Sequence, residues 1–342
     1  MKPVRRLFPL ALPLLVALVA ASCSRSASPP ATVSGTDITD AQVAAAAGVF
    51  QTLFGLQRAT CGEKTDAQTD TDAAACNRYA LGALIEYRLA EGYAAANGIS
   101  ISDADVQQQV GQIRTSLGST SLDAQLATHG ATAADLSNLV RLSALESKVA
   151  EQITLGKIGG EAGLRGQYQD RLAEFTVVQV DNIVVKTQAE AEQVYRQVTQ
   201  PGSTEQDFLN LAKQVSIDPT AKQNSGSISS TTASQFPKPF ADAVVTLQPG
   251  EISKPVHSTF GWHVIRMVTK QVTPYAKARP QLLQDAEVTA FGDWLRSQVD
   301  AGQVDVNPSF GRYDRSALQV VRITSTEASG TPSASPSATI SP

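Results

Sequence analysis

Apolar residues recur at helical spacing through the first half of the chain. In three segments they lie three or four positions apart, which is the period of an amphipathic α-helix. Ser102 and Thr132 precede the second and third segments, each with an aspartate three residues later, and this pattern can cap a helix. The spacing therefore predicts an all-helical domain over residues 38–175. The three apolar groups are Leu81, Leu84, Ile85 and Leu89, then Val106, Val110, Ile113 and Leu117, then Leu136, Leu139, Val140 and Leu145.

The pattern changes in the second half of the chain. Val178, Val180 and Val184 alternate with further apolar residues, so both faces of this strand are apolar and a central place in a sheet is expected. Two helical segments, a Gly/Ser-rich loop at 224–230, a helix begun by a proline and two strands follow. The order β-α-α-β-α-β-β predicts an α+β domain over residues 176–270, with a small mixed sheet flanked by helices.

The remaining segments divide into one helix and two polar stretches. The apolar period from Pro280 to Val299 predicts a helix within a carboxy-terminal region of residues 271–315. Residues 23–37, and residues 324–342 within the final stretch 316–342, are rich in Ser, Thr and Pro and have no apolar period. They are expected to form a flexible tether and a mostly disordered tail.

The amino terminus has the pattern of an export signal. Basic residues precede an apolar run from Leu7 to Ala21, which predicts a signal peptide over residues 1–22. The run is shorter than the roughly 20 residues that span a bilayer. Cys23 follows two alanines and a serine, and this resembles a bacterial lipobox, in which the thiol is lipidated. The sequence therefore predicts an extracytoplasmic protein with a lipid anchor to the membrane, although ordinary cleavage with an incidental cysteine is the alternative.

Cys61 and Cys76 are the other two cysteines. They enclose a polar stretch without an apolar period. Because exported proteins form disulfides, a bond between the two is expected, and closing such a loop contributes about 3 kcal/mol in the chain-entropy model. Two reduced, buried thiols are the alternative.

Composition removes several classes of function. Lys and Arg number 28 against 32 Asp and Glu, a formal net charge of −4. No basic block is long enough to follow a phosphate backbone, so nucleic acid is not an expected partner. The chain has three histidines and lacks the CxxC, HExxH, GxSxG, GxGxxG and GxxxxGK[ST] motifs. We therefore expect no metal site and no cofactor.

Several motifs in the second half resemble one family. FLNLAKQVSIDPTAK, FPKPFADAVVTLQPGEISKPV and FGWHVI occur in this order, and over residues 177–269 they resemble a parvulin-type (PpiC, rotamase) peptidyl-prolyl isomerase domain. The flanking regions resemble the PrsA- and SurA-type exported foldases. This resemblance implies an amino-terminal chaperone-like domain that holds the isomerase, and a carboxy-terminal helix that packs back onto it.

The resemblance also implies a site. It places an apolar pocket for the proline ring and a polar group beside the amide bond. Core packing, a satisfied core histidine and a turn aspartate remain the simpler explanations for the same residues. The pocket residues are Ile228, Phe236 and Phe240, and the polar residues are Asp218, His263 and the supporting Ser258.

Two departures from the family pattern bear on activity. The first strand normally begins with a histidine, and this chain has Asn182, which hydrogen-bonds but does not titrate. The family loop Gly-Gly-Asp-Leu-Gly is Ser-Gly-Ser-Ile-Ser at residues 225–229, with two glycines lost. Weak isomerase activity is therefore expected.

The resulting hypothesis is an extracytoplasmic foldase. It catalyses prolyl cis-trans isomerisation, and its partners are unfolded or partly folded secreted proteins. The rival hypothesis is a non-catalytic holding chaperone with a degenerate parvulin domain. A structural envelope lipoprotein is the third.

Overall fold

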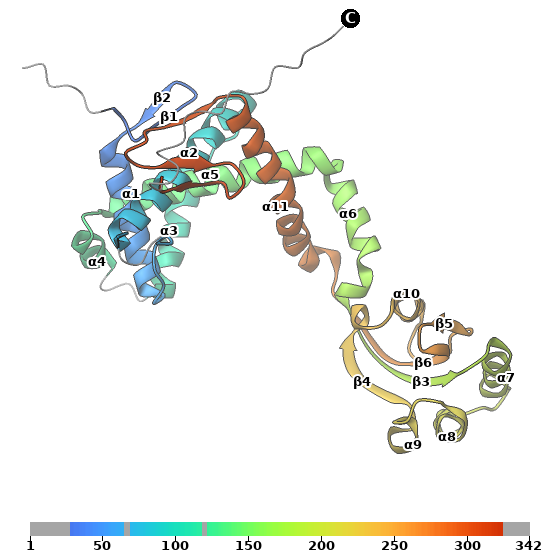
Figure 1. Cartoon of the computed structure of the whole chain (residues 1–342). Coiled ribbons are helices and arrows are strands. Elements are labelled where there is room, and N and C mark those ends of the chain that lie inside the picture. Colours follow the sequence, from blue (N-terminus) through green and yellow to red (C-terminus); the bar gives the residue numbers. More distant parts are fainter. Residues whose placement is uncertain (1–27, 65–68, 118–121, 324–342) are drawn as a thin grey trace, which may run out of the picture.

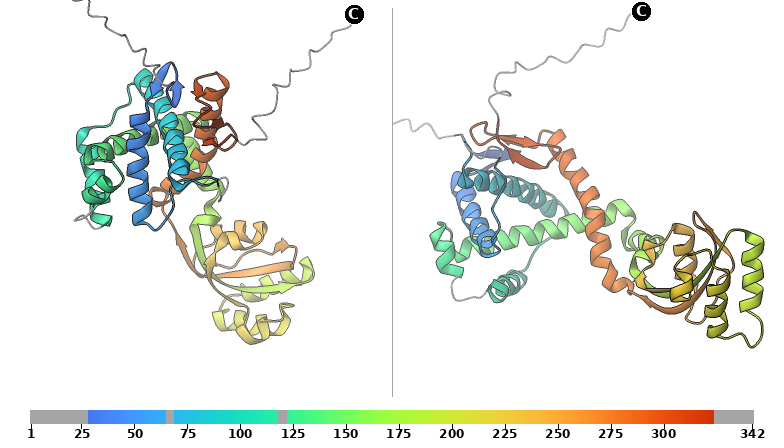
Figure 2. Two further views of the ribbon diagram at one scale, coloured as in Figure 1. Left: turned by 60° about the vertical axis from the view of Figure 1, so that its left-hand side comes forward. Right: turned by 60° about the horizontal axis from the view of Figure 1, so that its bottom comes forward.

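Two domains lie at opposite ends of the molecule (Figures 1 and 2). The computed structural model describes residues 28–64, 69–117 and 122–323, so the expected signal peptide, Cys23 and most of the expected tail lie outside the described residues. The insert domain, residues 176–272, interrupts a helical domain that holds both ends of the described chain. Among the helices in these ranges, none combines the length and hydropathy needed to cross a bilayer.

Local sequence signals set the ends of the long helices. Thr132 accepts a hydrogen bond from the backbone N–H of Asp135, and the Asp135 carboxylate accepts one from the N–H of Thr132. This capping box begins α5, and Gly159, with a φ of 85°, ends it in the left-handed conformation. The helices of the helical domain are α1 (Asp40–Leu56), α2 (Asp72–Asn97), α3 (Asp103–Leu117), α4 (Leu122–Thr128), α5 (Ala133–Ile158), α6 (Gly160–Asp170) and α11 (Tyr275–Asp300), with a 3-10 turn at Leu172–Phe175.

The expected tether is partly wrong, because its end forms a sheet. β1 (Ala31–Val33) pairs with β2 (Thr36–Ile38) and with β7 (Val304–Val306). Ala31 and Val33 are buried, and they pack with residues from the far end of the chain. A further hairpin, β8 (Arg312–Asp314) and β9 (Gln319–Val321), packs on α2, so ordered structure also reaches into the expected tail.

The insert domain is built on a four-stranded sheet of order β4-β3-β6-β5. The α+β class is confirmed, but the expected mixed sheet is wrong, because every neighbouring pair is antiparallel. The helices after β3 return the chain to the end of β3 that it left, so β4 runs the opposite way. The expected loop at 224–230 is also shorter than predicted, since β4 begins at Ser227. The elements are β3 (Thr176–Val185), α7 (Gln188–Val198), α8 (Glu205–Val215), α9 (Ala221–Asn224), β4 (Ser227–Thr232), a 3-10 turn at Ala233–Gln235, α10 (Lys238–Thr246), β5 (Val256–Ser258) and β6 (Gly261–Val272).

The two faces of this sheet are covered by different helices. α7 and α8 cover one face, where Ile183 packs against Phe208 and its neighbours. α10 covers the other face, where Phe240 packs in a cluster with Val180 and Ile265. The predicted site residues on β3 and β6 point to this second face.

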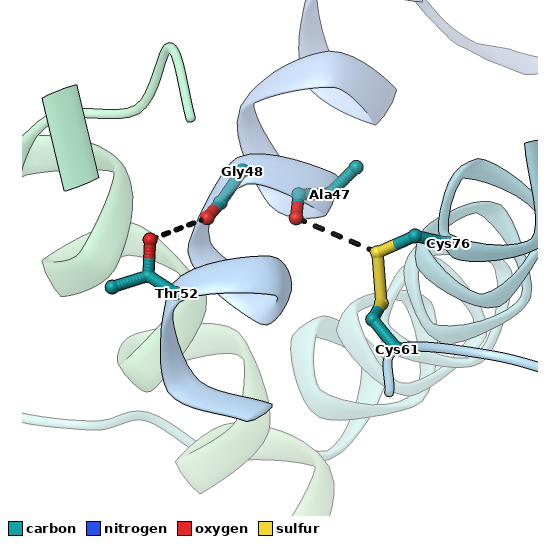
Figure 3. The surroundings of a disulfide bond; sticks show 5 residues. All are labelled: Ala47, Gly48, Thr52, Cys61 and Cys76. Atoms are coloured by element: carbon teal, nitrogen blue, oxygen red, sulfur yellow. Dashed lines mark hydrogen bonds between the residues drawn. A yellow bond between two sulfur atoms is a disulfide. The ribbon is translucent and has the colours of Figure 1, made fainter. Parts of the chain in front are cut away.

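A bond between Cys61 and Cys76 joins the segment after α1 to the first turns of α2. The two sulfur atoms lie 2.00 Å apart, the geometry of the disulfide that the sequence predicts. Figure 3 shows the bond beside α1, where Cys76 Sγ lies 3.6 Å from the carbonyl oxygen of Ala47. Gly62, next to Cys61, lets this segment lie against the start of α2, because a Cβ there would lie 2.4 Å from the Ala75 carbonyl oxygen.

We expect the Cys61–Cys76 bond to persist in purified, unreduced protein. Alkylation followed by mass spectrometry should leave both residues unlabelled, and reduction should lower the free energy of unfolding of the helical domain by about 3 kcal/mol. The unfolding of the insert domain should not change, and it provides the internal control. Labelling of both thiols without a reductant would contradict this prediction.

Candidate functional site

Three apolar side chains meet on the face of the sheet that α10 covers. Phe240, in the first turn of α10, is 2% exposed, and its ring centroid lies 4.5 Å from that of the half-buried Phe236. Ile228, on the edge strand β4, packs against the same cluster. Pro237 follows Phe236 at the N-cap of α10, and Pro239 lies in the first turn, so prolines mark the start of the helix that carries Phe240. The predicted apolar pocket residues are thus brought together.

Three polar side chains from three strands form a chain of hydrogen bonds beside this cluster. Asn182 Oδ1 on β3 lies 3.1 Å from His263 Nδ1 on β6, and His263 Nε2 lies 2.7 Å from Ser258 Oγ on β5. Because the Asn182 oxygen faces Nδ1, that nitrogen carries the hydrogen, and Nε2 accepts from the Ser258 hydroxyl. Ser258 Oγ in turn accepts from the backbone N–H of Phe260 at 3.0 Å. The three side chains are buried, so each fixes the orientation of the next.

The polar chain touches the apolar cluster through one ring contact. His263 presents its ring to Phe240 at 89° with centroids 5.3 Å apart. Burial, together with the charge of nearby His257, lowers the pKa of His263 to about 4. The imidazole is therefore neutral at neutral pH, and it acts as a fixed dipole beside the apolar cluster.

We expect acid to destabilise the insert domain through His263. Its pKa in the folded state lies below the ordinary value of 6.5, so the unfolded chain binds the proton more tightly. Stability is thus fully present above pH 6.5 and is lost as the pH falls toward 4, by about 2–3 kcal/mol at pH 4.5. Urea unfolding at pH 7 and 4.5 should show this loss relative to His263→Gln, which does not titrate. An equal loss in the variant would contradict it.

Asp218 lies in the same domain but has other partners. Its Oδ1 accepts hydrogen bonds of 2.9 Å from both the backbone N–H and the hydroxyl of Thr220, a turn typical of an aspartate before a proline. Among the described residues, no hydrogen bond joins the Asp218 carboxylate to His263, so its place beside the substrate amide stays a prediction. Ser216, which the sequence did not single out, links this turn to β3, because its Oγ accepts from the backbone N–H of Val184 and of Asp218.

The one glycine that the loop before β4 retains has a steric reason. Gly226 has a φ of 78°, and a Cβ there would lie 2.3 Å from the carbonyl oxygen of Asn182. Its own carbonyl accepts the backbone N–H of Asn182 at 2.9 Å, so this loop positions the polar chain directly. Ser225, where the family has a glycine, also adopts a positive φ, of 59°. The loop thus holds a non-glycine residue in the left-handed region, at a conformational cost.

A buried ion pair that sequence reasoning missed supports the opposite face of the sheet. Asp181 and Arg266 pair across β3 and β6 through Nε and Nη2 at 3.0 and 2.7 Å, and Ser227 Oγ donates to the other carboxylate oxygen at 2.6 Å. Glu205 of α8 also binds Arg266. The charged pair in a central strand was the available signal, since such residues are buried only with a partner. It ties β4 to β3 next to the site.

Comparison with known proteins relates the insert domain to one family and the chain to named relatives. Residues 177–269 match the family model described as Rotamase: PPIC-type PPIASE domain. Foldase protein PrsA of Clostridium tetani is 28% identical over 196 residues, which are 55% of this chain and 57% of the relative. Foldase protein PrsA 4 of Bacillus cereus is 26% identical over 196 residues, 56% of this chain and 64% of the relative. The chain thus spans less than two thirds of the length of these relatives.

The solved structures that resemble the chain carry related names. The crystal structure of a peptidylprolyl isomerase (PrsA) from Bacillus cereus covers 81% of this chain and 92% of its own, with 18% identity and a TM-score of 0.35. The family match confirms the predicted parvulin-type domain, and the chain is similar to the PrsA foldases. Among the described residues, no group of three or more His, Cys, Asp or Glu could hold a metal ion.

Proposed function

We propose that this chain, which carries a PPIC-type domain and is similar to the PrsA foldases, is an extracytoplasmic foldase that catalyses prolyl cis-trans isomerisation. The observation that supports this most is the contact between two features of the insert domain. Phe240, which pairs with Phe236, lies edge-on to His263 in the neutral, hydrogen-bonded Asn182–His263–Ser258 chain. An apolar pocket beside fixed dipoles suits a reaction that breaks no covalent bond.

The chemistry asks little of these side chains. Rotation about an X-Pro bond has a barrier of about 18–20 kcal/mol, because the planar amide is stabilised by resonance. Phe236, Phe240 and Ile228 hold the proline ring away from water, and the twisted amide, which has lost resonance, is bound better than the planar one. His263 and Asn182 orient the pocket through Phe240 and the strand pairing. No nucleophile or redox group is required of the chain.

In this proposal, the rest of the chain attaches the protein to the membrane and binds client proteins. Lipid on Cys23 anchors the protein to the extracytoplasmic face of the membrane, and unfolded or partly folded secreted proteins are its partners. The lipobox resemblance and the foldase names of the relatives support this assignment. The helical domain has a groove between α1, α2 and α5 with a volume of about 320 Å³, which mixes apolar side chains with charged ones at its rim. Such a groove suits weak, tolerant binding of unfolded chains.

The test combines a peptide assay with a client assay. The protein should accelerate isomerisation of a short proline peptide weakly, at a rate that does not vary between pH 6 and 8, because His263 stays neutral there. Asn182→His should raise the rate, since it restores the ring that the family carries at this position. Suppression of client aggregation without any turnover, in both the native chain and Asn182→His, would instead favour the holding chaperone. The absence of both isomerase activity and client protection would contradict the proposal as a whole.

A further inference from the structure

Two glutamates from different helices meet inside the helical domain. Glu86 on α2 and Glu146 on α5 lie close enough for their side-chain carboxyl groups to interact, and both are only partly exposed. Tyr313, on β8 near the end of the described chain, donates its hydroxyl to Glu86 Oε1 at 3.4 Å. Two like acids in contact cannot both ionise without repulsion, so at least one must hold a proton while they touch.

The surroundings offer these acids hydroxyl groups. Tyr79 and Tyr87 of α2 lie within range of the charge of both glutamates, Ser143 of α5 is a hydrogen-bond partner of Tyr87, and Tyr313 of β8 bonds Glu86. Burial raises the pKa of each of the three tyrosines. Arg322, directly after β9, donates to the Thr69 hydroxyl, and Lys148 of α5 donates to the Ser100 carbonyl oxygen. Five further cations nearby have carboxylate partners elsewhere, and no ion pair to Glu86 or Glu146 is found within the described ranges. These cations and their partners are Lys64 with Asp72, Arg78 with Asp70, Arg88 with Glu91, Arg296 with Asp293 and Arg312 with Asp314.

The pKa values of both glutamates lie near physiological pH. Burial raises the pKa of Glu86 to about 7. Burial and then the charge of Glu86 raise the pKa of Glu146 to about 8. The folded state therefore binds protons more tightly than the unfolded chain. Its stability from this source is fully present below the ordinary glutamate value and is lost as the pH rises through 7 and 8.

Tyr313 connects this pair to the β8–β9 hairpin. The hairpin lies directly on α2, where a Cβ on Gly82 would be in ordinary van der Waals contact with the Val320 backbone nitrogen, 3.5 Å away. Gly82 and Glu86 are one helical turn apart, which places the Val320 and Tyr313 contacts on the same face of α2. A cavity of about 320 Å³ between the hairpin and α2 includes Glu86 in its lining, so packing around this carboxyl group is incomplete.

We propose that Glu86 and Glu146 form a proton-controlled latch for the β8–β9 hairpin. With a shared proton the two acids hold each other and accept the Tyr313 hydroxyl, and the hairpin stays docked on α2. When both are charged they repel each other within a poorly solvated site, and water enters by displacing the hairpin. The displacement uncovers apolar residues of α2, among them Leu81 and Ile85, which pack with Val320 in the closed state. This device is independent of the isomerase assignment.

Amide hydrogen exchange of residues 312–321 in the full chain tests the latch. After correction for the intrinsic pH dependence of exchange, these amides should exchange at least tenfold faster at pH 9 than at pH 6. The Glu86→Gln, Glu146→Gln double variant should change less than twofold between the two pH values. Glu91→Gln, on the same helix but paired with Arg88 at the surface, is the matched control and should behave like the native chain.

A second variant guards against altered packing in the double variant. Glu146→Gln alone leaves one carboxyl beside a neutral amide, so it should reduce the acceleration to less than threefold. All three histidines remain in every variant, so their titration affects all of the proteins alike. Equal protection at pH 6 and 9 in the native chain would overturn the proposal. The proposal would also be overturned if exchange in Glu146→Gln, or in the Glu86→Gln, Glu146→Gln double variant, accelerated as much as in Glu91→Gln.

Discussion

Replacing Phe240 by alanine is expected to abolish prolyl isomerisation and to destabilise the insert domain by about 3–5 kcal/mol. The ring is 2% exposed, lies 4.5 Å from Phe236 between centroids, and separates the His263 ring from the proposed proline pocket. Its loss opens a cavity on the α10 face of the sheet and lets water reach the amide bond. A water-exposed pocket no longer favours the twisted amide over the planar one.

Phe208 provides the matched control for this variant. It is 1% exposed and packs on the opposite face of the same sheet, among residues of α7 and α8. Phe208→Ala should therefore cost a similar free energy of unfolding but leave the pocket intact. The measurement is kcat/KM on a proline peptide at a temperature where urea titration shows both variants folded. Comparable residual activity in the two variants would contradict the pocket assignment.

Local sequence signals predicted elements whose causes are local. The capping box at Thr132, the change of apolar period after residue 175 and the proline at the start of α10 each act within a few residues, and the corresponding elements are present. The strand at Ala31–Val33 could not be predicted in this way. Of its two partners, β2 is adjacent but β7 lies at the other end of the chain, and a strand of three residues carries too little period of its own.

The candidate site likewise has residues that a sequence motif predicts and residues whose contacts depend on the folded chain. His263, Phe236 and Phe240 were predicted from a motif in register, and the structure brings them into contact. Asp218 occupies its predicted segment, but its side chain binds Thr220, because a short acidic side chain competes for nearby backbone groups. The sequence did not single out Glu86, because a glutamate on a helix has the pattern of a surface residue. Only packing in the folded chain brings a second acid against it.

The last expectation is that the helical domain folds and retains client binding without the insert domain. The ends of the insert are adjacent: Thr176 pairs with Val272, and the N–H of Thr273 donates to the carbonyl of Phe175 at 2.7 Å. The apolar clusters of the helical domain contain no residue from 176–272. Joining Phe175 to Thr273 through a short Gly/Ser linker should therefore leave these clusters intact.

The excised protein should lose isomerase activity completely and still suppress aggregation of an unfolded client. Its far-UV circular dichroism and thermal midpoint should first show that the helical domain is folded. Light scattering of one aggregating client then compares it with the isolated insert domain at equal molarity. The insert domain is the demanding comparison, because it holds most of the large apolar side chains that are exposed among the described residues: Val177, Val215, Ile217 and Phe260. If the insert domain alone protects the client, binding resides on that apolar surface and the helical domain is a spacer. Protection by the excised protein instead assigns client binding to the helical domain, with its groove between α1, α2 and α5.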